Sequence, residues 1–395
     1  MLRRLCFLPL LAAIACAAPP APPAKPPAAP AAAPAAAAAS GPEMDSKTLL
    51  YPGEERYLAR VRQLTFAGQN AEAYWSPDGT RLIFQSDRGE LPCDQIFVMQ
   101  ADGSGVRRVS DGRGRTTCSY FLPGTDSILY ASTSAAAAEC PKPPDRSRGY
   151  VWALDDFDLY VAREDGSEPR KLFSSPVYDA EATVSRDGRR IVFTSAKDGD
   201  LELYAMNADG TGLTRLTNTP GYDGGAFYSD DGSKIVYRAD HPSTPEALAA
   251  YRENLARGVY APRGLEIRVM RADGTGDRAV TGNGAANFAP YFFPGGRRII
   301  FSSNLANPRG RDFDLYAIAE DGTGLERITR SPTFDGFPMF DATGSRLVFA
   351  SNRNGAKPGD TNIFVADWVE PSAAAAARAA GSREILAVRA RPRAQ

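Results

Sequence analysis

The chain has 395 residues, and its 46 Lys and Arg nearly balance 47 Asp and Glu, which leaves a formal net charge of −1. Proteins that bind nucleic acid need a basic face, so this balance excludes nucleic acid as the expected partner. The length would allow two domains, but a regular internal repeat makes one closed domain the simpler prediction.

Residues 1–16 predict an export signal. Arg3 and Arg4 precede an apolar run over residues 5–14, which is too short to span a bilayer. The segment Ala13-Ile14-Ala15-Cys16 resembles a bacterial lipoprotein cleavage box, which would leave a lipid on Cys16. Ordinary cleavage after Ala15 or Ala17 is the alternative. We expect a periplasmic or outer-membrane-anchored protein that meets the membrane only through this anchor.

Residues 17–60 read as a linker and lead-in. The part from Ala17 to Ser40 is almost entirely Ala and Pro, which cannot bury a core and favours an extended, semi-rigid spacer. Such a spacer would hold a globular head away from a membrane, although a dispensable leader fits the composition too.

Residues 61–370 contain two kinds of turn that alternate along the chain. Asp-Gly turns between short β-branched and aromatic runs predict hairpins, because Gly and Asp tolerate positive φ. Two successive copies, at Gly188 and Gly232, lie 44 positions apart. A period of about 40 to 45 residues with four strands per repeat is typical of a propeller blade. We expect six blades, at 66–109, 110–172, 173–216, 217–280, 281–328 and 329–370.

The repeats resemble the TolB-like family of six-bladed β-propellers. The resemblance rests on the turn Ser76-Pro77-Asp78-Gly79 and on the strand ends Phe84-Gln85-Ser86-Asp87-Arg88 and Phe349-Ala350-Ser351-Asn352-Arg353. It implies an all-β fold and a periplasmic scaffold that contacts partner proteins of the cell envelope. We expect no TolB-type N-terminal domain, since residues 17–60 are mostly linker.

Residues 61–65 predict how the ring closes. Their sequence, Val-Arg-Gln-Leu-Thr, aligns with the outermost strands of other blades at 213–217 and 325–329, and the last blade lacks such a strand after Trp368. Open sheet edges promote aggregation. We therefore expect residues 61–65 to pair into blade six.

The long insertions fall on one predicted face, at 134–156, 240–264, 304–312 and 352–361. Elaborated loops on a regular scaffold often carry function, so this face is the expected binding surface. Ser243-Thr244-Pro245-Glu246 predicts the start of a short helix over 245–257. That helix could form a partial lid or could merely cover its own blade.

Polar residues recur where the innermost strands begin. One row contains Asn70, Thr116, Asp179, Asp223, Asn287 and Asp335, and two positions later come Glu72, Cys118, Glu181, Gly225, Ala289 and Phe337. Because innermost strands line the channel, we expect Asn70, Glu72, Asp179, Glu181, Asp223, Asn287 and Asp335 at its mouth. They could bind Ca²⁺ or a basic peptide tail, or serve only in Asx-turns.

A further row precedes each third strand, at Gln95, Asp158, Glu202, Glu266, Asp314 and Asn362. Its recurrence in every blade predicts architecture, through polar pairing, and no function.

The remaining reactive residues give weaker signals. His241 is the one histidine of the chain, and no Gly-x-Ser-x-Gly elbow accompanies it, so we interpret it as a loop residue. Cys93, Cys118 and Cys140 remain after export, which favours a disulfide. The preferred pair is Cys118 with Cys140, and Cys93 is the alternative partner. The Ala- and Arg-rich tail at 371–395 predicts disorder.

These features favour a monomeric, non-enzymatic envelope scaffold, without a cofactor unless Ca²⁺ occupies the channel mouth, that binds a protein or a peptide segment. The alternative is a propeller lyase or glycosidase that uses Glu72 and Glu181. A carbohydrate- or peptide-binding module without turnover is a third interpretation.

Overall fold

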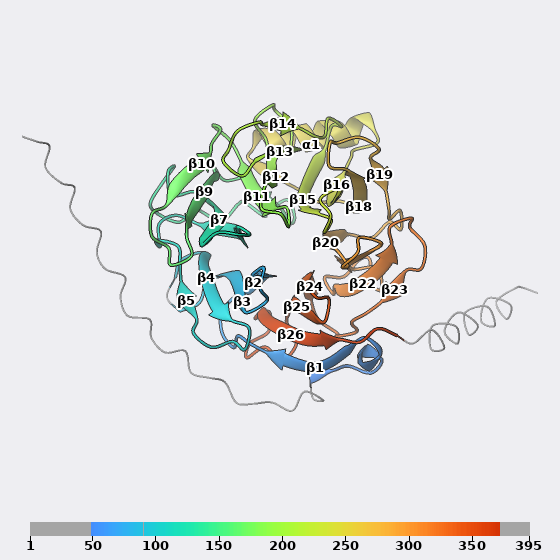
Figure 1. Ribbon diagram of the computed structural model, residues 1–395. Helices are drawn as coiled ribbons and strands as arrows, with labels where there is room; N and C mark the ends of the chain where they lie inside the picture. The colour runs from blue at the N-terminus through green and yellow to red at the C-terminus, as the bar shows by residue number, and fades with distance from the viewer. Residues whose placement is uncertain (1–48, 90, 372–395) are drawn as a thin grey trace, which may run out of the picture. The chain divides into compact units, whose positions relative to one another are not determined.

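The computed structural model describes residues 49–89 and 91–371. Six four-stranded antiparallel sheets surround one axis (Figure 1), and this arrangement confirms the predicted six-bladed β-propeller. The predicted signal, Cys16, the linker up to residue 48 and the tail from residue 372 lie outside the described residues.

Each of the first five blades takes four strands from one stretch of chain, ordered from the axis outward. Blade one has β2 (Asn70–Trp75), β3 (Arg81–Ser86), β4 (Gln95–Gln100) and β5 (Arg107–Arg108); blade two has β6 (Thr116–Phe121), β7 (Ser127–Ser132), β9 (Asp158–Arg163) and β10 (Arg170–Phe173). Blade three has β11 (Asp179–Val184), β12 (Arg190–Ser195), β13 (Glu202–Asn207) and β14 (Thr214–Arg215); blade four has β15 (Tyr222–Tyr228), β16 (Lys234–Asp240), β18 (Glu266–Arg271) and β19 (Arg278–Ala279). Blade five has β20 (Asn287–Phe292), β21 (Arg298–Ser303), β22 (Asp314–Ala319) and β23 (Glu326–Arg327).

Blade six joins the two ends of the described chain. It contains β24 (Asp335–Phe340), β25 (Arg346–Ser351) and β26 (Asn362–Trp368), and its outermost strand is β1 (Leu58–Gln63). In Figure 1 the blue strand β1 lies beside the red-orange strand β26. The register pairs Leu58 with Trp368 and Gln63 with Phe364, so the predicted closure is confirmed and the closing strand begins at Leu58.

The lead-in before β1 is packed against blade six. A short 3₁₀ helix, η2 (Glu54–Arg56), places the Glu54 carboxylate against the Arg353 guanidinium at 3.0 Å, and both side chains are fully buried. Arg353 also pairs with Asp335 at 2.8 Å and donates to the carbonyl oxygen of Leu49. This buried ionic group fixes the lead-in to the ring.

The hairpin turns form as the sequence predicts. In the first turn of blade one the Asp78 carboxylate accepts hydrogen bonds from the Ser76 hydroxyl at 2.5 Å and from the Thr80 amide at 3.0 Å, and Gly79 has φ +68°. These bonds hold the pKa of Asp78 at about 2. This turn therefore closes its hairpin through local side-chain bonds, and Arg346 of blade six adds a bond to the carbonyl oxygen of Gly79 at 2.7 Å.

The four long insertions all connect the second and third strands of their blades, so they share one face, which we call the insertion face. Helix α1 (Pro245–Ala256) follows the predicted cap, since the Thr244 hydroxyl accepts a hydrogen bond from the Ala247 amide at 3.1 Å. Its one buried residue, Tyr251, donates to Asp200 and to the carbonyl oxygen of Gly221. The helix thus packs over blades three and four near the outer rim (Figure 1).

The row that precedes the third strands is architectural, as predicted. Its side chains bond the outermost strand of their own blade or the Ser or Thr that follows it, for example in the pairs Lys171–Asp158, Arg215–Glu202 and Arg327–Asp314. That Ser or Thr in turn accepts a third-strand amide, as Ser110 does from Ile96. These bonds hold the short fourth strands in place.

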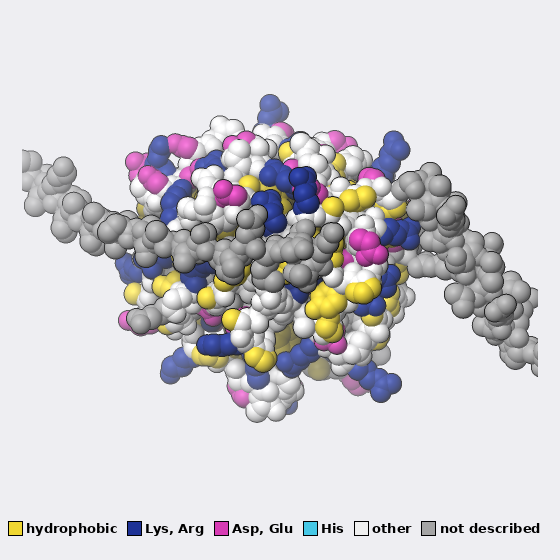
Figure 2. Space-filling model, turned by 90° about the horizontal axis from the view of Figure 1, so that it is seen from below, with side chains coloured by type: hydrophobic (Ala, Val, Ile, Leu, Met, Phe, Trp, Pro, Cys, Tyr) yellow, Lys and Arg dark blue, Asp and Glu magenta, His cyan; other side chains and the backbone are white. Residues whose placement is uncertain are grey.

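Cationic and anionic side chains are interspersed over the side of the ring that carries β1 and β26 (Figure 2). Among the described residues, no helix combines the length and the apolar character that crossing a bilayer requires.

Candidate functional site

A bulge near the start of every innermost strand shapes the channel wall. Each first-to-second strand ladder shifts register there, and the bulge residue has φ between 48° and 59° in all six blades. The bulge residues are Glu72, Cys118, Glu181, Gly225, Ala289 and Phe337. Left-handed backbone disfavours side chains, yet five of the six are not glycine. Since the bulge is common to all blades, the fold accounts for the conformation but not for the choice of side chain.

The residues two positions before the bulge are buried inside the blades and do not line the channel opening. Asn70, Asp179, Asp223, Asn287 and Asp335 are each fully buried. Four of them accept a hydrogen bond from the serine that ends the second strand: Ser86 to Asn70, Ser195 to Asp179, Ser303 to Asn287 and Ser351 to Asp335. Their geometry is that of structural ties, so of the seven predicted mouth residues only Glu72 and Glu181 remain in the candidate site.

Glu181 is held by an array of donors. Its carboxylate pairs with Arg238, and it accepts hydrogen bonds from the Tyr222 hydroxyl at 2.8 Å, the Thr194 hydroxyl at 2.8 Å and the Gly225 amide at 3.0 Å. A side chain at the neighbouring Gly224 would collide with both Glu181 and Tyr222. Glu181 therefore anchors blade three to blade four.

Glu72 lies in the same part of the channel but carries none of those bonds. Burial raises the pKa of Glu72 to about 7, with Arg238 opposing the shift and Glu181 adding to it. The neighbouring Cys118 thiol also has its pKa raised well above the ordinary value, by burial and by these two carboxylates. Near neutral pH, Glu72 can thus take up or release a proton, while Cys118 stays a thiol.

The opposite wall of this part of the channel is aromatic. Phe288, Phe313, Phe334 and Phe337, from blades five and six, contact one another with ring centroids 5.0 to 6.1 Å apart. The mouth therefore has one acidic side, in blades one to three, and one apolar side.

Two insertions join above the acidic side. Strand β8 (Trp152–Ala153), in the blade-two insertion, pairs with β17 (Val259–Tyr260), in the blade-four insertion. The Trp152 ring lies 5.0 Å from the Arg238 guanidinium and 5.2 Å from the ring of Tyr260. The tip, Tyr150, lies near Arg311 of the blade-five insertion. The insertions of blades two, four and five are thus linked around the mouth, and Arg148 of the blade-two insertion also pairs with Glu253 of α1 at 2.8 Å.

The disulfide corrects the preferred cysteine pairing. Cys93 bonds to Cys140 with a Cα–Cα distance of 6.0 Å, and Cys118 is free. The alternative partner, Cys93, is the one the structure shows. Cys118 could not serve because it is the bulge residue of β6 and faces the channel, whereas Cys93 and Cys140 both lie beside the carbonyl oxygen of Gly114 on the insertion face.

The channel is closed between its two ends. Tyr74 of blade one and Phe227 of blade four belong to opposite blades, yet their ring centroids are 5.6 Å apart. Tyr120 contacts both rings, and Tyr291 contacts Phe227. This closing layer separates the hairpin-turn end of the channel from the mouth at the insertion face, and we call that mouth, with Glu72, Glu181 and the four phenylalanines, the blind chamber.

His241 is a tie residue and not part of the chamber. Its Nε2 lies 2.8 Å from the Asp223 carboxylate, at the position where Arg88 and Arg353 bond Asn70 and Asp335 in blades one and six. Within the described chain, no group of three or more His, Cys, Asp or Glu is arranged to hold a metal ion.

Sequence reasoning missed Arg238, Tyr222 and the phenylalanine cluster. The Gly224-Gly225 pair was the available signal for Glu181, because no other blade has glycine at both positions and paired glycines mark close approach of side chains to backbone. The phenylalanines come from loops and strands in two blades, and no spacing unites them.

No family model matches the chain. Among solved structures, the gluconolactonase XC5397 from Xanthomonas campestris gives a TM-score of 0.53 at 14% identity, covering 81% of this chain and 94% of that one. TolB from Acinetobacter baumannii gives a TM-score of 0.51 at 16% identity, covering 78% of this chain and 65% of that one. Identities this low show likeness of fold alone. The chain is a six-bladed β-propeller with a TolB-like fold.

Proposed function

We propose that this protein is an exported envelope scaffold that binds a peptide segment of a partner protein in the blind chamber of the insertion face. The observation that carries the proposal is the division of the chamber into an acidic side and an aromatic side. Arg238 already neutralises Glu181, so a bound segment would meet the carboxyl group of Glu72, which releases its proton near neutral pH and would do so more readily beside a cation. The matching segment is a basic residue beside an aromatic or large apolar one.

Three features of the sequence support a location at the cell envelope. An export signal over residues 1–16, a lipid on Cys16 and an Ala/Pro spacer would hold the propeller at a membrane surface. The TolB-like resemblance supports the same setting. A monomer with one chamber fits a scaffold that engages one segment at a time.

A peptide panel tests the binding. We expect peptides with Lys next to Phe to bind the wild-type protein, and peptides with Glu in place of Lys to bind at least tenfold more weakly. Phe337→Ala should weaken binding because the ring supplies one wall of the chamber. Arg189→Gln is a matched surface control, since Arg189 is exposed in a turn at the other end of the channel. Binding that ignores both the peptide charge and Phe337→Ala would contradict the proposal.

One observation favours a second candidate, an enzyme. A carboxyl group with a pKa of about 7, as in Glu72, suits general acid or base catalysis near neutral pH. A lyase could use that one base. A two-carboxylate glycosidase would need Glu181 as its second group, but that side chain is held by Arg238 and Tyr222. Turnover of polysaccharides or lactones that is lost in Glu72→Gln would support the enzyme, and peptide binding would then need another explanation.

A further inference from the structure

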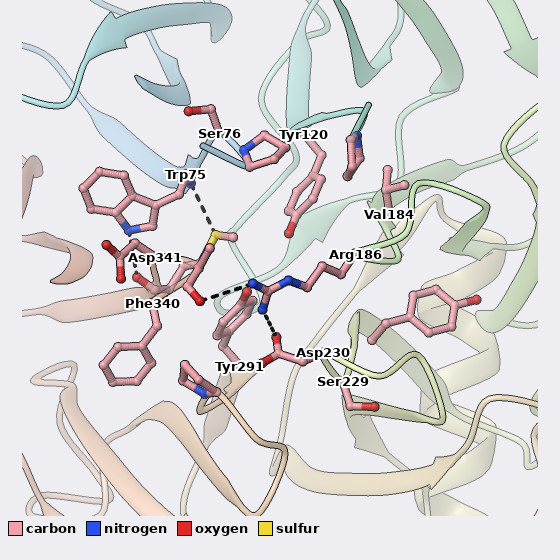
Figure 3. A pocket seen from close by; sticks show the side chains of 16 residues that line it. Trp75, Ser76, Tyr120, Val184, Arg186, Ser229, Asp230, Tyr291, Phe340 and Asp341 are labelled. Carbon is pink, nitrogen blue, oxygen red and sulfur yellow. Dashed lines mark hydrogen bonds and ion pairs between the residues drawn. The ribbon is translucent and has the colours of Figure 1, made fainter. Parts of the chain in front are cut away.

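A second cavity occupies the opposite end of the channel, among the hairpin turns (Figure 3). Its volume is about 170 Å³, and its inner boundary includes Tyr120, Tyr291 and Met339 next to the closing layer. Its other lining residues include the aromatic side chains of Trp75, Tyr228 and Phe340 and the carboxylate of Asp341, which Arg346 pairs at 2.9 Å. This cavity shares no lining residue with the chamber of the insertion face that we propose to bind peptide.

The rim of the cavity is a ring of equivalent turn residues. The second position of each first turn contributes one residue, and the six are Pro77, Pro123, Arg186, Asp230, Pro294 and Ala342. Four of them are proline or alanine, which close the rim without offering a charge. Arg186 is the cation of the ring, and the structure of the turn does not require it, because proline fills the same position in three other blades.

The side chain of Arg186 extends from blade three across the cavity toward blade six. Its guanidinium pairs with the Asp230 carboxylate at 3.0 Å and donates to the carbonyl oxygen of Ala342, in the opposite blade, at 3.2 Å. Its side chain is 51% exposed. Exposed ion pairs are weak, so a better-placed anion can take Arg186 from Asp230.

Two phenols flank this guanidinium (Figure 3). Burial raises the pKa of both Tyr120 and Tyr291. Their hydroxyls therefore stay protonated. The Tyr291 hydroxyl donates to that of Tyr120, which leaves the Tyr120 O–H as the donor open to a ligand. Arg186 and the Tyr120 hydroxyl form a donor group above an aromatic floor, a combination that suits an anion attached to a flat apolar body.

We propose that this cavity binds a small carboxylic acid with a single aromatic ring, with its carboxylate on Arg186 and its ring between the aromatic walls. The size fits, since an engineered apolar cavity of about 150 Å³ takes up benzene. Asp230 acts as the internal competitor that occupies Arg186 when no ligand is bound. The Gly295 amide, which donates to Asp230 at 3.2 Å, keeps that carboxylate in place.

Calorimetric titration with benzoate, benzyl alcohol and benzylamine tests the proposal on the full chain. We expect wild-type protein to bind benzoate more tightly than the other two. Arg186→Gln should reduce benzoate affinity about tenfold or more, because a charge-assisted bond is lost. Asp230→Asn should raise it several-fold, because the competitor is weakened. Arg189→Gln, in the same turn but pointing to solvent, should leave it unchanged.

Three results would overturn the proposal. One is the absence of benzoate binding at millimolar concentration by both the wild type and Asp230→Asn. Another is equal benzoate affinity of the wild type and a folded Arg186→Gln. The third is tighter binding of benzylamine than of benzoate, which would make the cavity a cation site built on Asp230 and the Ala342 carbonyl. Because opposing effects are expected for Arg186→Gln and Asp230→Asn, misfolding of one variant leaves the other decisive.

Discussion

Blades six and four each bury an aspartate, but they pair it with different side chains. In each, an aspartate at the start of the innermost strand is fully buried, Asp335 in blade six and Asp223 in blade four. Asp335 accepts a hydrogen bond from Ser351 and pairs with the permanently charged Arg353. Asp223 has alanine, Ala239, where the serine would be, and His241 where the arginine would be. One repeat thus pairs its aspartate with a permanently charged arginine, and the other pairs it with a histidine, whose charge depends on pH.

This difference shows that the repeat determines the position of the aspartate's partner but not whether that partner is permanently charged. The His241 ring occupies the position that the Arg353 guanidinium has in blade six, so either side chain can bond the buried aspartate. Burial alone would lower the pKa of His241, but the hydrogen bond and the charge of Asp223 outweigh it and raise the pKa. Burial raises the pKa of Asp223. Its Oδ2 is buried without a hydrogen-bond partner in the described structure.

The largest effect should come from breaking the ion pair of blade six. Arg353→Met leaves both Glu54 and Asp335 buried without their cation, and removal of one partner from a buried pair costs about 3 to 5 kcal/mol. Urea unfolding measures the loss. Arg88→Met, in blade one, is the matched control, because Arg88 donates to the neutral Asn70 and should cost about 1 kcal/mol. Equal losses would show that the buried charges of blade six do not matter.

The second effect concerns the pH dependence of blade four. A raised His241 pKa contributes stability below the unfolded value near 6.5, and that stability is lost as the pH rises through the folded pKa. We expect the melting temperature of the wild type to fall by a few degrees between pH 6 and pH 9 relative to that of His241→Gln. Parallel curves for the two proteins would contradict this assignment.

A smaller effect should follow from making blade four more like blade six. Ala239→Ser places a hydroxyl where Ser86, Ser195, Ser303 and Ser351 stand in other blades, within reach of Asp223. One added hydrogen bond to a buried acceptor should raise the free energy of unfolding by about 1 kcal/mol. Ser303→Ala in blade five is the reverse control and should lower it by a similar amount. A loss of stability in Ala239→Ser would mean that blade four has closed around the missing hydroxyl.

The smallest effect is expected from removal of calcium. In the row of residues that suggested a Ca²⁺ site, most side-chain oxygens already accept hydrogen bonds from serines, from Arg353 or from His241. We therefore expect a chelator to leave the melting temperature within about one degree. A larger fall in melting temperature would indicate that a metal ion binds these residues. The buried aspartates would then be stabilised by the metal and not by Arg353 and His241.

The fold was predictable because its determinants are local and repeated six times. Asp-Gly turns, alternating strands and the match of residues 61–65 to other outermost strands define blades, order and closure without long-range information. The helix start at Thr244 was predictable for the same reason. Its site of packing was not, since Tyr251 bonds Asp200 and Gly221, which no pattern connects to it.

The candidate site was only half predictable. Alignment of the blades selected Glu72 and Glu181, which lie near each other and near Arg238 in the structure, because equivalent positions of equivalent strands face the same way. It also selected Asn70 and Asp179, which lie two positions away and are buried, because the bulge that separates the two rows leaves no mark in residue type. The predicted disulfide pairing was wrong for a related reason, because the bulge turns Cys118 toward the channel and away from Cys140.

The closing strand β1 also bears on how the molecule is made. Leu58 can pair with Trp368 only after the intervening 309 residues have been synthesised, so the first strand to leave the ribosome is the last to find its neighbour. Contacts between such distant positions slow folding and leave strand edges exposed in the meantime. If the chain is exported unfolded, closure on the far side of the membrane would spare the cytoplasm a ring with an open edge.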